Sequence, residues 1–214
     1  LDLPNLDDSS QALRGKLDSS ICELRNLNSL YFSDNFLEGY IPKCIGSLGQ
    51  LTQLKLASNE LINGSIPHTL ANLSNLQNLE LGYNSLVATD LEWLSHLSNL
   101  RYLDLSFVNI SGAIDWPLSI SKIPSLLELY LNLCGFPEFN PKSIPHTNSS
   151  TSLQILSLSG NRLNSSTLLW VLNVSKDLTS LDFSQNYLQS VPHGFANMTS
   201  LQYLDLSNND LIVA

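Results

Sequence analysis

Residues 76–86 read LQNLELGYNSL, and this short stretch sets the pattern for nearly the whole chain. Its frame, L-x-x-L-x-L-x-x-N-x-L, recurs eight times, and its asparagine slot is occupied by Asn35, Asn59, Asn84, Val108, Cys134, Asn161, Asn186 and Asn209. Successive slots lie 24, 25, 24, 26, 27, 25 and 23 residues apart. Spacing this regular indicates one structural unit repeated in tandem.

The L-x-L core of the frame alternates with period two, which is typical of a short strand with one buried face. One strand per repeat predicts a parallel sheet in which each repeat covers the apolar side of the next. The asparagine follows the strand, where its amide can satisfy buried backbone groups of neighbouring turns. Val108 and Cys134 should fill the same volume without those hydrogen bonds, and we expect Cys134 to be a buried structural thiol.

Composition agrees with a repeat and excludes several classes of protein. The 214 residues include 46 Leu, 32 Ser and 22 Asn, and the formal net charge is −9. The acidic balance argues against a nucleic-acid partner, because phosphate binding needs a basic surface. With 43% hydrophobic and 14% charged residues, the chain is unlike a disordered protein. The sequence contains no apolar run of about 18 residues, so we expect no membrane contact within it.

The second half of the repeats carries a family resemblance. Residues 37–42 read LEGYIP and residues 61–67 read LINGSIP, with a degenerate copy at 13–18. This L-x-G-x-I-P element resembles the plant extracellular class of leucine-rich repeats. Residues 88–97 (ATDLEWLSHL) and 103–116 are similar to plant receptor-like proteins of the fungal-elicitor and disease-resistance type and to related receptor kinases. The resemblance implies an α/β horseshoe solenoid, with a parallel sheet on its concave face and short 3-10 or irregular convex segments.

Residues 1–214 are therefore predicted to form a single array of about eight repeats, preceded by a partial one. The paired-cysteine cap, C-terminal cap, membrane helix and kinase domain of the family have no counterpart, so we expect an uncapped fragment of a longer ectodomain. The Gly-x-Ile-Pro element is missing or altered after Asn84, Val108, Cys134, Asn161 and Asn186. We expect the convex segments of those repeats to differ in shape, with an irregular loop over 137–151.

Cysteines and sequons bear on the cellular compartment. Cys22 and Cys44 occupy corresponding places in adjacent repeats, so a disulfide is within reach, and two separate thiols remain the alternative. N-x-S/T sequons occur at Asn63, Asn72, Asn109, Asn148, Asn164, Asn173 and Asn197. Composition alone would give about four, so their placement in turns and connecting segments is the better argument for a glycosylated secreted protein.

The five open positions before the asparagine slot in each of the eight frames define the face that sequons leave bare. These forty positions hold six acids and six aromatic residues, where composition would give about four and about three. Tyrosine beside charge on a rigid face favours protein recognition. We predict a ligand site in the central three repeats, formed by Glu80, Tyr83, Arg101, Tyr102, Asp104, Phe107, Glu128 and Tyr130. The alternative is a solvated sheet whose tyrosines only pack on their neighbours.

Nothing in the sequence favours catalysis. Metal, phosphate-loop and nucleophile motifs are absent, and His68, His96, His146 and His193 share no short motif with Cys or Asp, so we expect no enzyme, metal or cofactor. The resemblance implies a ligand-sensing segment of a plant immune or developmental receptor at the cell surface. It would bind a protein, peptide or glycan and associate with a co-receptor kinase. The alternatives are a secreted apoplastic inhibitor similar to polygalacturonase-inhibiting proteins, and a non-functional receptor gene fragment.

Overall fold

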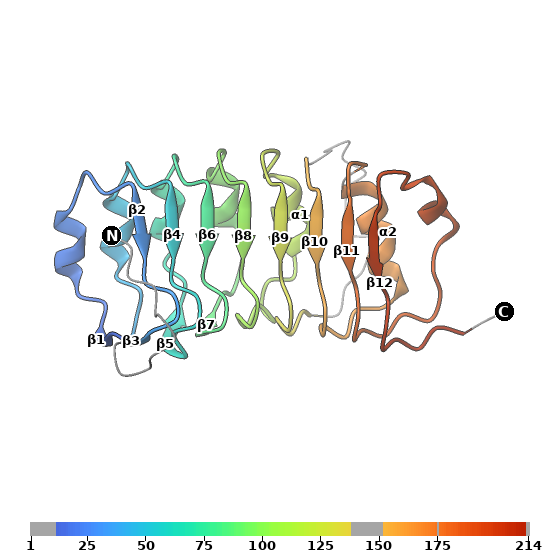
Figure 1. The fold of residues 1–214 in the computed structure, drawn as a ribbon, viewed down its shortest axis with the longest axis horizontal. Coiled ribbons are helices and arrows are strands. Elements are labelled where there is room, and N and C mark those ends of the chain that lie inside the picture. The colour runs from blue at the N-terminus through green and yellow to red at the C-terminus, as the bar shows by residue number, and fades with distance from the viewer. Residues whose placement is uncertain (1–11, 138–151, 175, 213–214) are drawn as a thin grey trace.

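The protein was analysed as a computed structural model that describes residues 12–137, 152–174 and 176–212. A parallel sheet of eight strands runs along its length in chain order, and its outer surface is called the concave face below (Figure 1). Its strands are β2 Ser29–Tyr31, β4 Gln53–Lys55, β6 Asn78–Glu80, β8 Tyr102–Asp104, β9 Glu128–Tyr130, β10 Ile155–Ser157, β11 Ser180–Asp182 and β12 Tyr203–Asp205. The expected solenoid with one such strand per repeat is confirmed.

From β2 to β11 every strand of this sheet buries the middle residue of its three, whereas Leu204 of β12 is 45% exposed. Leu54, Leu79 and Leu103 are fully buried, while the residues on either side of each face solvent in part. The buried leucines of all repeats join one continuous apolar cluster. Because adjacent strands pair without any register shift, equivalent residues of neighbouring repeats lie side by side in straight rows across the face.

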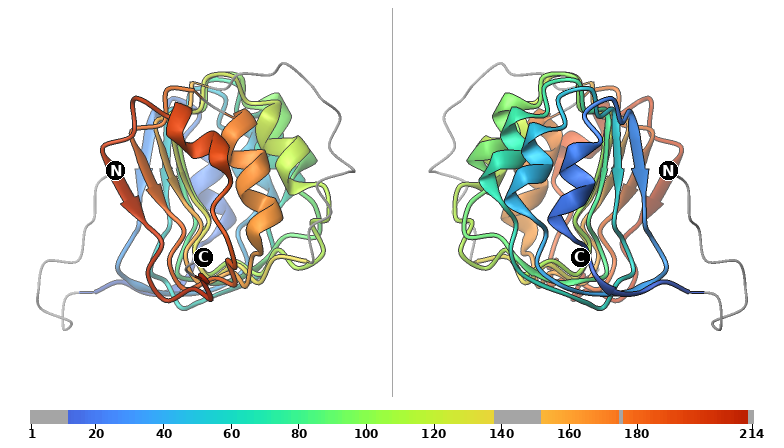
Figure 2. Two further views of the ribbon diagram at one scale, coloured as in Figure 1. Left: turned by 90° about the vertical axis from the view of Figure 1, so that its right-hand side faces the viewer. Right: turned by 90° about the vertical axis from the view of Figure 1, so that its left-hand side faces the viewer.

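Helices cover the opposite side of the core, as the two end views show (Figure 2). The 3-10 helices are η1 Ser19–Glu23, η2 Lys43–Ser47, η3 His68–Asn72, η4 Glu92–His96 and η6 His193–Asn197. Two α-helices, α1 Trp116–Ser121 and α2 Ser165–Val174, replace them in the repeats that follow Val108 and Asn161. The expectation that a repeat without Gly-x-Ile-Pro has a different convex segment is therefore confirmed for those two repeats.

The same expectation was wrong for the repeats that follow Asn84 and Asn186. They lack Gly-x-Ile-Pro, and yet η4 and η6 are 3-10 helices like the others. Pro192 precedes η6 with φ −62°, just as Pro42 precedes η2 with φ −61°. A proline fixes φ near this value, so Pro192 alone suffices to set the entry into the helix. The irregular loop expected over 137–151 lies outside the described residues except for Pro137.

A second parallel sheet, which the sequence did not predict, borders the first along one side of the N-terminal half (Figure 1). It consists of β1 Arg14–Lys16, β3 Phe36–Gly39, β5 Leu61–Ser65 and β7 Ser85–Val87. Strands β3, β5 and β7 are formed by residues that follow Asn35, Asn59 and Asn84, and β1 lies in the degenerate copy at 13–18. The sequence pattern had indicated turns there. The face they form is called the lateral sheet below.

The asparagine ladder has the form that the sequence predicts. Asn59 is fully buried; its Nδ2 donates to the Phe32 carbonyl of the preceding repeat at 2.8 Å, and its Oδ1 accepts from the Leu37 amide at 3.0 Å. Such bonds satisfy backbone groups that would be costly to bury alone. Each asparagine therefore ties its own turn to the repeat before it.

Cys134 departs from the expectation that a thiol loses these bonds. It is buried as predicted, but its Sγ donates to the Leu105 carbonyl at 3.2 Å, and its backbone amide donates to Asn161 Oδ1 at 2.7 Å. The thiol is small enough to reach the carbonyl that an asparagine amide would bind. Desolvation raises the pKa of this thiol, so it is held in its neutral form.

Candidate functional site

The central strands β6, β8 and β9 bring five of the predicted site residues into two adjacent rows. In one row Tyr102 lies opposite Glu128, and in the other Asp104 lies between Glu80 and Tyr130. Their side chains point away from the core because they alternate with buried leucines. The structure thus gathers on one surface the residues that the sequence assigned to three different repeats.

The tyrosines form a diagonal pair at the middle of this surface. The rings of Tyr102 and Tyr130 have centroids 5.4 Å apart with an interplanar angle of 37°, and the Tyr130 hydroxyl donates to Glu128 Oε2 at 3.1 Å. This tilted packing is the geometry that aromatic pairs prefer. Both rings are half-buried, so they form a fixed apolar floor rather than mobile side chains.

The electrostatic environment of the pair is negative. Partial burial first, and then the charges of Asp104, Glu80 and Glu128, raise the pKa of Tyr102. Partial burial and the neighbouring Glu128 raise the pKa of Tyr130 to about 12. The nearby carboxylates disfavour the negative charge that either tyrosine would gain by losing its proton. The same field favours a positively charged group that approaches the surface.

Glu80 differs from the other acids because a base neutralises it. Lys55 Nζ lies 2.7 Å from Glu80 Oε1 across the β4–β6 pair, and it also stands 5.4 Å from the centre of the Tyr31 ring. Sequence analysis assigned Glu80 to the site and left Lys55 out. Lys55, Glu80 and Asp104 follow one another in the same row of the sheet. Because Lys55 neutralises Glu80, Asp104 is the first acid of this row whose charge Lys55 does not balance.

Asp104 has a structural task as well as a place in the site. Its Oδ1 accepts the backbone amide of Ser106 at 2.8 Å, which closes the turn at the end of β8. Asp205 makes the same bond to the amide of Ser207 at 2.8 Å. An aspartate that accepts the amide two residues on is a common turn former. One carboxylate oxygen of Asp104 is thus engaged by the fold.

Tyr83 and Phe107 form a second aromatic pair at the end of the strands. Both are nearly half exposed, their ring centroids lie 4.7 Å apart, and both have left-handed backbones, with φ +55° and +65°. Their backbone amides donate to the carbonyls of Ser106 and Asn132 in the next repeats, which holds this strained conformation in place.

The same left-handed position holds Leu133 one repeat further on, with φ +53° and 47% of its surface exposed. Its side chain covers Gly160, where an added Cβ would meet Leu133 Cδ2 at 2.6 Å. Tyr83, Phe107 and Leu133 thus form an apolar ridge beside the row that contains Glu80 and Asp104. Sequence analysis did not include Leu133; its place directly before the asparagine slot, shared with Tyr83 and Phe107, was the available signal.

Arg101 completes the predicted set at the start of β8. Its side chain is exposed and takes part in no ion pair within the described residues, while its carbonyl accepts the amides of Leu127 and Glu128. It is therefore the one base of the predicted site and lies at the opposite end of β8 from Asp104. All eight predicted residues lie on the concave face or its rim.

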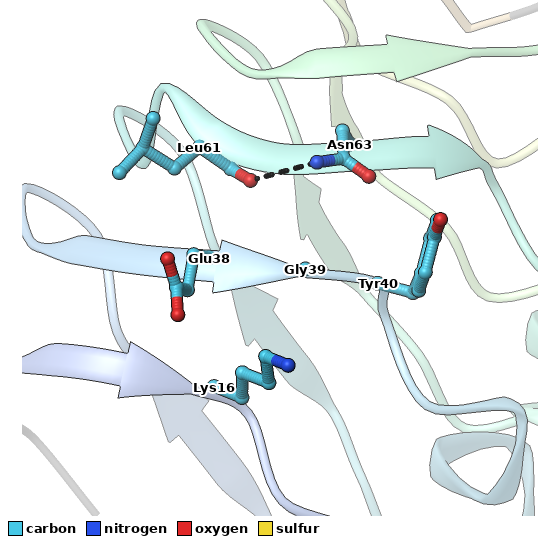
Figure 3. Close-up of a pocket in the computed structure, with 6 residues that line it drawn as sticks. All are labelled: Lys16, Glu38, Gly39, Tyr40, Leu61 and Asn63. Carbon is cyan, nitrogen blue, oxygen red and sulfur yellow. Dashed lines mark hydrogen bonds between the residues drawn. The ribbon is translucent and has the colours of Figure 1, made fainter.

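A separate shallow pocket of about 350 Å³ lies on the lateral sheet (Figure 3). It is lined by Lys16, Glu38, Gly39, Tyr40, Leu61 and Asn63. Tyr40 is 73% exposed, and Leu61 is about half exposed. Sequence analysis did not predict this pocket, because it treated these residues as parts of turns.

The structure joins Cys22 and Cys44 in a disulfide with a Cα–Cα distance of 5.9 Å. The bridge links η1 to η2 on the helical side, far from the concave face. Six of the seven sequon asparagines lie in the described residues, all with exposed side chains: Asn63, Asn72, Asn109, Asn164, Asn173 and Asn197. Asn148 lies outside them. Asn63 stands within strand β5 rather than in a turn.

The parts of the chain that the structure describes contain no cluster of His, Cys, Asp and Glu suited to a metal ion. They also contain no helix long and apolar enough to cross a membrane. Of the four histidines considered above, His68 pairs with Asp90 at 3.4 Å on the exposed surface. His146 lies outside the described residues.

Comparisons with known proteins agree with the geometry. The family described as "Leucine rich repeat" matches residues 26–48, 64–110 and 151–211. Receptor-like protein EIX1 of Solanum lycopersicum is 42% identical over 201 residues, which cover 92% of this chain and 19% of that protein. This chain thus spans about a fifth of that relative's length.

Solved structures give the same result. The plant peptide hormone receptor RGFR1, in complex with RGF2, superposes with a TM-score of 0.75 at 31% identity, over 94% of this chain and 31% of that one. The ectodomain of the Arabidopsis receptor kinase HAESA, in complex with an IDA peptide hormone ligand, gives 0.64 at 26% identity, over 92% and 36%. The chain therefore belongs to the leucine-rich repeat family, and it is similar to part of the repeats of plant receptor-like proteins.

Proposed function

We propose that this chain is part of the extracellular ligand-recognition surface of a plant cell-surface receptor, and that it binds a peptide or protein on the concave face over β6, β8 and β9. The observation that carries the proposal is the Tyr102–Tyr130 pair flanked by Asp104 and Glu128. Aromatic side chains that are rigid and partly buried dominate binding energy at protein interfaces. The names of EIX1 and RGFR1 support a receptor more than a secreted enzyme inhibitor.

The chemistry of the surface narrows the ligand class. Lys55 balances Glu80, so Asp104 and Glu128 leave an acidic strip beside the tyrosines, and the ridge of Tyr83, Phe107 and Leu133 adds apolar area next to it. Opposite charges across an interface steer association and fix orientation. The proposed ligand therefore carries a basic side chain over the acidic strip and an apolar side chain on the ridge.

Signalling is proposed to follow from association with a co-receptor kinase once the ligand is bound, in immunity or development. Support for this step comes from the family resemblance and from the names of the relatives. The convex helices η1, η2 and η4 carry no sequon asparagine and lie outside the proposed ligand surface, so this part of the convex side remains available to a second protein (Figure 2).

A panel of synthetic ten-residue peptides tests the ligand class. Each peptide contains one leucine and either two lysines, two alanines or two glutamates, and binding is measured by interferometry at low and high salt. We expect the lysine peptides to bind best and to weaken at high salt, because exposed charge pairs are screened. Equal binding of the three groups would contradict the acidic strip as the selective element.

Matched variants then place the site. Asp104→Asn removes one charge and keeps an oxygen that accepts the Ser106 amide, so the turn survives. Asp205→Asn is the control, because it makes the same change in the equivalent turn four strands away. We expect Asp104→Asn to weaken the lysine peptides about 5-fold, consistent with a partly screened charge pair, and Asp205→Asn to have little effect. Equal effects would move the site off the central repeats.

A further inference from the structure

The pocket on the lateral sheet contains a glycosylation sequon among its own walls. Asn63 of the N-G-S sequon points outward from β5, as does Leu61, while Ile62 between them is buried (Figure 3). Asn63 Nδ2 donates to the Leu61 carbonyl at 3.2 Å. A glycosylated asparagine keeps one N–H on this nitrogen, so the same bond can orient the linkage.

Tyr40 directly follows the neighbouring strand β3, beside that asparagine. Glu38 pairs with Leu61 and Gly39 with Ile62, so the register continues to Tyr40 and Asn63. Adjacent strands are about 4.8 Å apart, which is within the width of a single sugar ring. The first sugar on Asn63 is therefore within reach of the Tyr40 ring.

The ring of Tyr40 is fixed on one side and open on the other. A Cβ placed on Gly64 would meet Tyr40 Cδ1 at 2.6 Å, so the ring packs directly on the glycine backbone, which has φ +81°. The rest of Tyr40 faces solvent, and 73% of the residue's surface is exposed. An aromatic ring held on a flat backbone with one free face offers an apolar surface to the C–H side of a sugar.

Two charged side chains complete the pocket. Lys16 in β1 and Glu38 in β3 are opposite each other in the strand register. Neither side chain takes part in an ion pair within the described residues. The Lys16 stem runs over Gly39, 3.6 Å from where a Cβ would stand. Ammonium donors and carboxylate acceptors are both available to hydroxyl and acetamido groups. The pocket thus combines an apolar floor and polar walls next to an attachment point.

An exposed tyrosine also lies beside a second sequon asparagine, here in the following repeat rather than in the preceding one. Asn164 of N-S-S forms a parallel bridge with Tyr187, which is 54% exposed. Asn164 Oδ1 accepts the Ser166 amide at 3.0 Å, which leaves Nδ2, the nitrogen that carries a sugar, directed away from that bond. An exposed tyrosine therefore flanks a sequon asparagine in two different repeats.

A third sequon supplies a natural comparison. Asn109 forms a parallel bridge with Val87, which is 36% exposed, and its Oδ1 accepts the Ser111 amide at 3.0 Å. Asn109 occupies the repeat position that Tyr187 occupies, and its partner Val87 occupies that of Asn164, so the bridge is the same with the roles exchanged. The neighbour of this sequon asparagine is aliphatic and small. Any effect that depends on an aromatic ring should therefore be weak at Asn109.

We propose that Tyr40 and Tyr187 are binding platforms for the protein's own N-glycans, and that each ring stacks against the first N-acetylglucosamine carried by Asn63 and Asn164 respectively. The platforms hold these glycans flat on the side of the solenoid, so the concave face stays open to ligand. The proposal rests on the extracellular location in the proposed function, since glycans are added only in the secretory pathway.

Tyrosine modification of the secreted, glycosylated protein tests the platforms without any variant. Nitration of each tyrosine is followed by peptide mass spectrometry on three samples: intact protein, protein trimmed to one sugar, and protein with the whole glycan removed. We expect Tyr40 and Tyr187 to react about 2- to 12-fold more slowly in the first two samples than in the third, the range that aromatic contacts give. Tyr83 on the concave rim is the internal control and should react alike in all three.

A mutant cycle gives a second measurement. Asn63→Gln should lower the urea midpoint in the natural background and in Tyr40→Phe, which keeps the ring, but should leave Tyr40→Ala unchanged. The same cycle with Asn109→Gln and Val87→Ala should show weaker coupling. If removing the whole glycan leaves the nitration rate of Tyr40 unchanged, the proposal is overturned. It is also overturned if Asn63 and Asn164 carry no glycan in protein that is glycosylated at Asn72 or Asn197. A protein with no glycan at any sequon would overturn the extracellular location as well.

Discussion

Replacing Asn186 by alanine should destabilise the array severely, although it removes only a small polar side chain. Asn186 is 2% exposed, and its Oδ1 accepts the amides of Asn161 at 3.1 Å and Leu163 at 2.8 Å. Its Nδ2 donates to the carbonyls of Leu158, Phe183 and Ser184 at 2.9–3.1 Å. One side chain therefore satisfies backbone groups of two repeats.

The size of the effect follows from the groups left without a partner. Asn186→Ala deprives two buried backbone amides of their acceptor, and each buried unsatisfied group costs about 1–3 kcal/mol. The Leu158 carbonyl keeps a donor in Asn161 Nδ2, so the carbonyls add less. We expect a loss of about 4 kcal/mol in the free energy of unfolding, out of the ~5–15 kcal/mol typical of folded proteins.

Urea unfolding followed by far-UV circular dichroism measures this loss, and hydrogen exchange at the amides of Asn161 and Leu163 locates it. Asn75→Ala is the matched control, because Asn75 is exposed and its Nδ2 makes one bond, to the Gly49 carbonyl. We expect the control to lose less than about 1 kcal/mol, as exposed positions do. The ladder argument would be refuted if Asn186→Ala cost no more than Asn75→Ala, or if the two amides kept their protection.

Other predictions concern the cysteines and the tyrosines. A Cys22→Ser, Cys44→Ser double variant should lose about 3 kcal/mol by urea unfolding, because the bridge closes a loop with a sequence separation of 22; peptide mapping without reductant should find the bridge, and two free thiols there would contradict it. Cys134 should resist alkylation in the native protein at pH 8 and react after unfolding, since burial raises its pKa; rapid native labelling would place it at the surface. The raised pKa of Tyr130, about 12 when folded, means that the unfolded chain releases this proton first, so stability present below pH 10 should fall as the pH rises from 10 to 12. Tyr130→Phe should show less of this fall, and an unchanged fall would assign it to other groups.

Much of the arrangement of the proposed ligand surface could be predicted from the sequence, because a parallel array without register shifts turns sequence spacing directly into position. Tyr102, Glu128 and Asp104 were assigned to one surface from their place in the frame, and the structure brings them together. The frame could not show that Lys55 neutralises Glu80, since an ion pair depends on rotamers that period and composition do not encode. It also could not show the left-handed backbone of Tyr83 and Phe107.

The sequence by itself determined the repeat, the buried leucines and the asparagine ladder, because each belongs to a local pattern that recurs eight times, with asparagine in six copies, and is stabilised by its neighbours. Only the tertiary structure decided the lateral sheet, in which residues after the asparagine pair across repeats. That pairing sets Tyr40 beside Asn63, and an isolated bridge outside this sheet sets Tyr187 beside Asn164. Such contacts join residues more than twenty positions apart, so they depend on how successive turns stack and not on any one turn's own sequence.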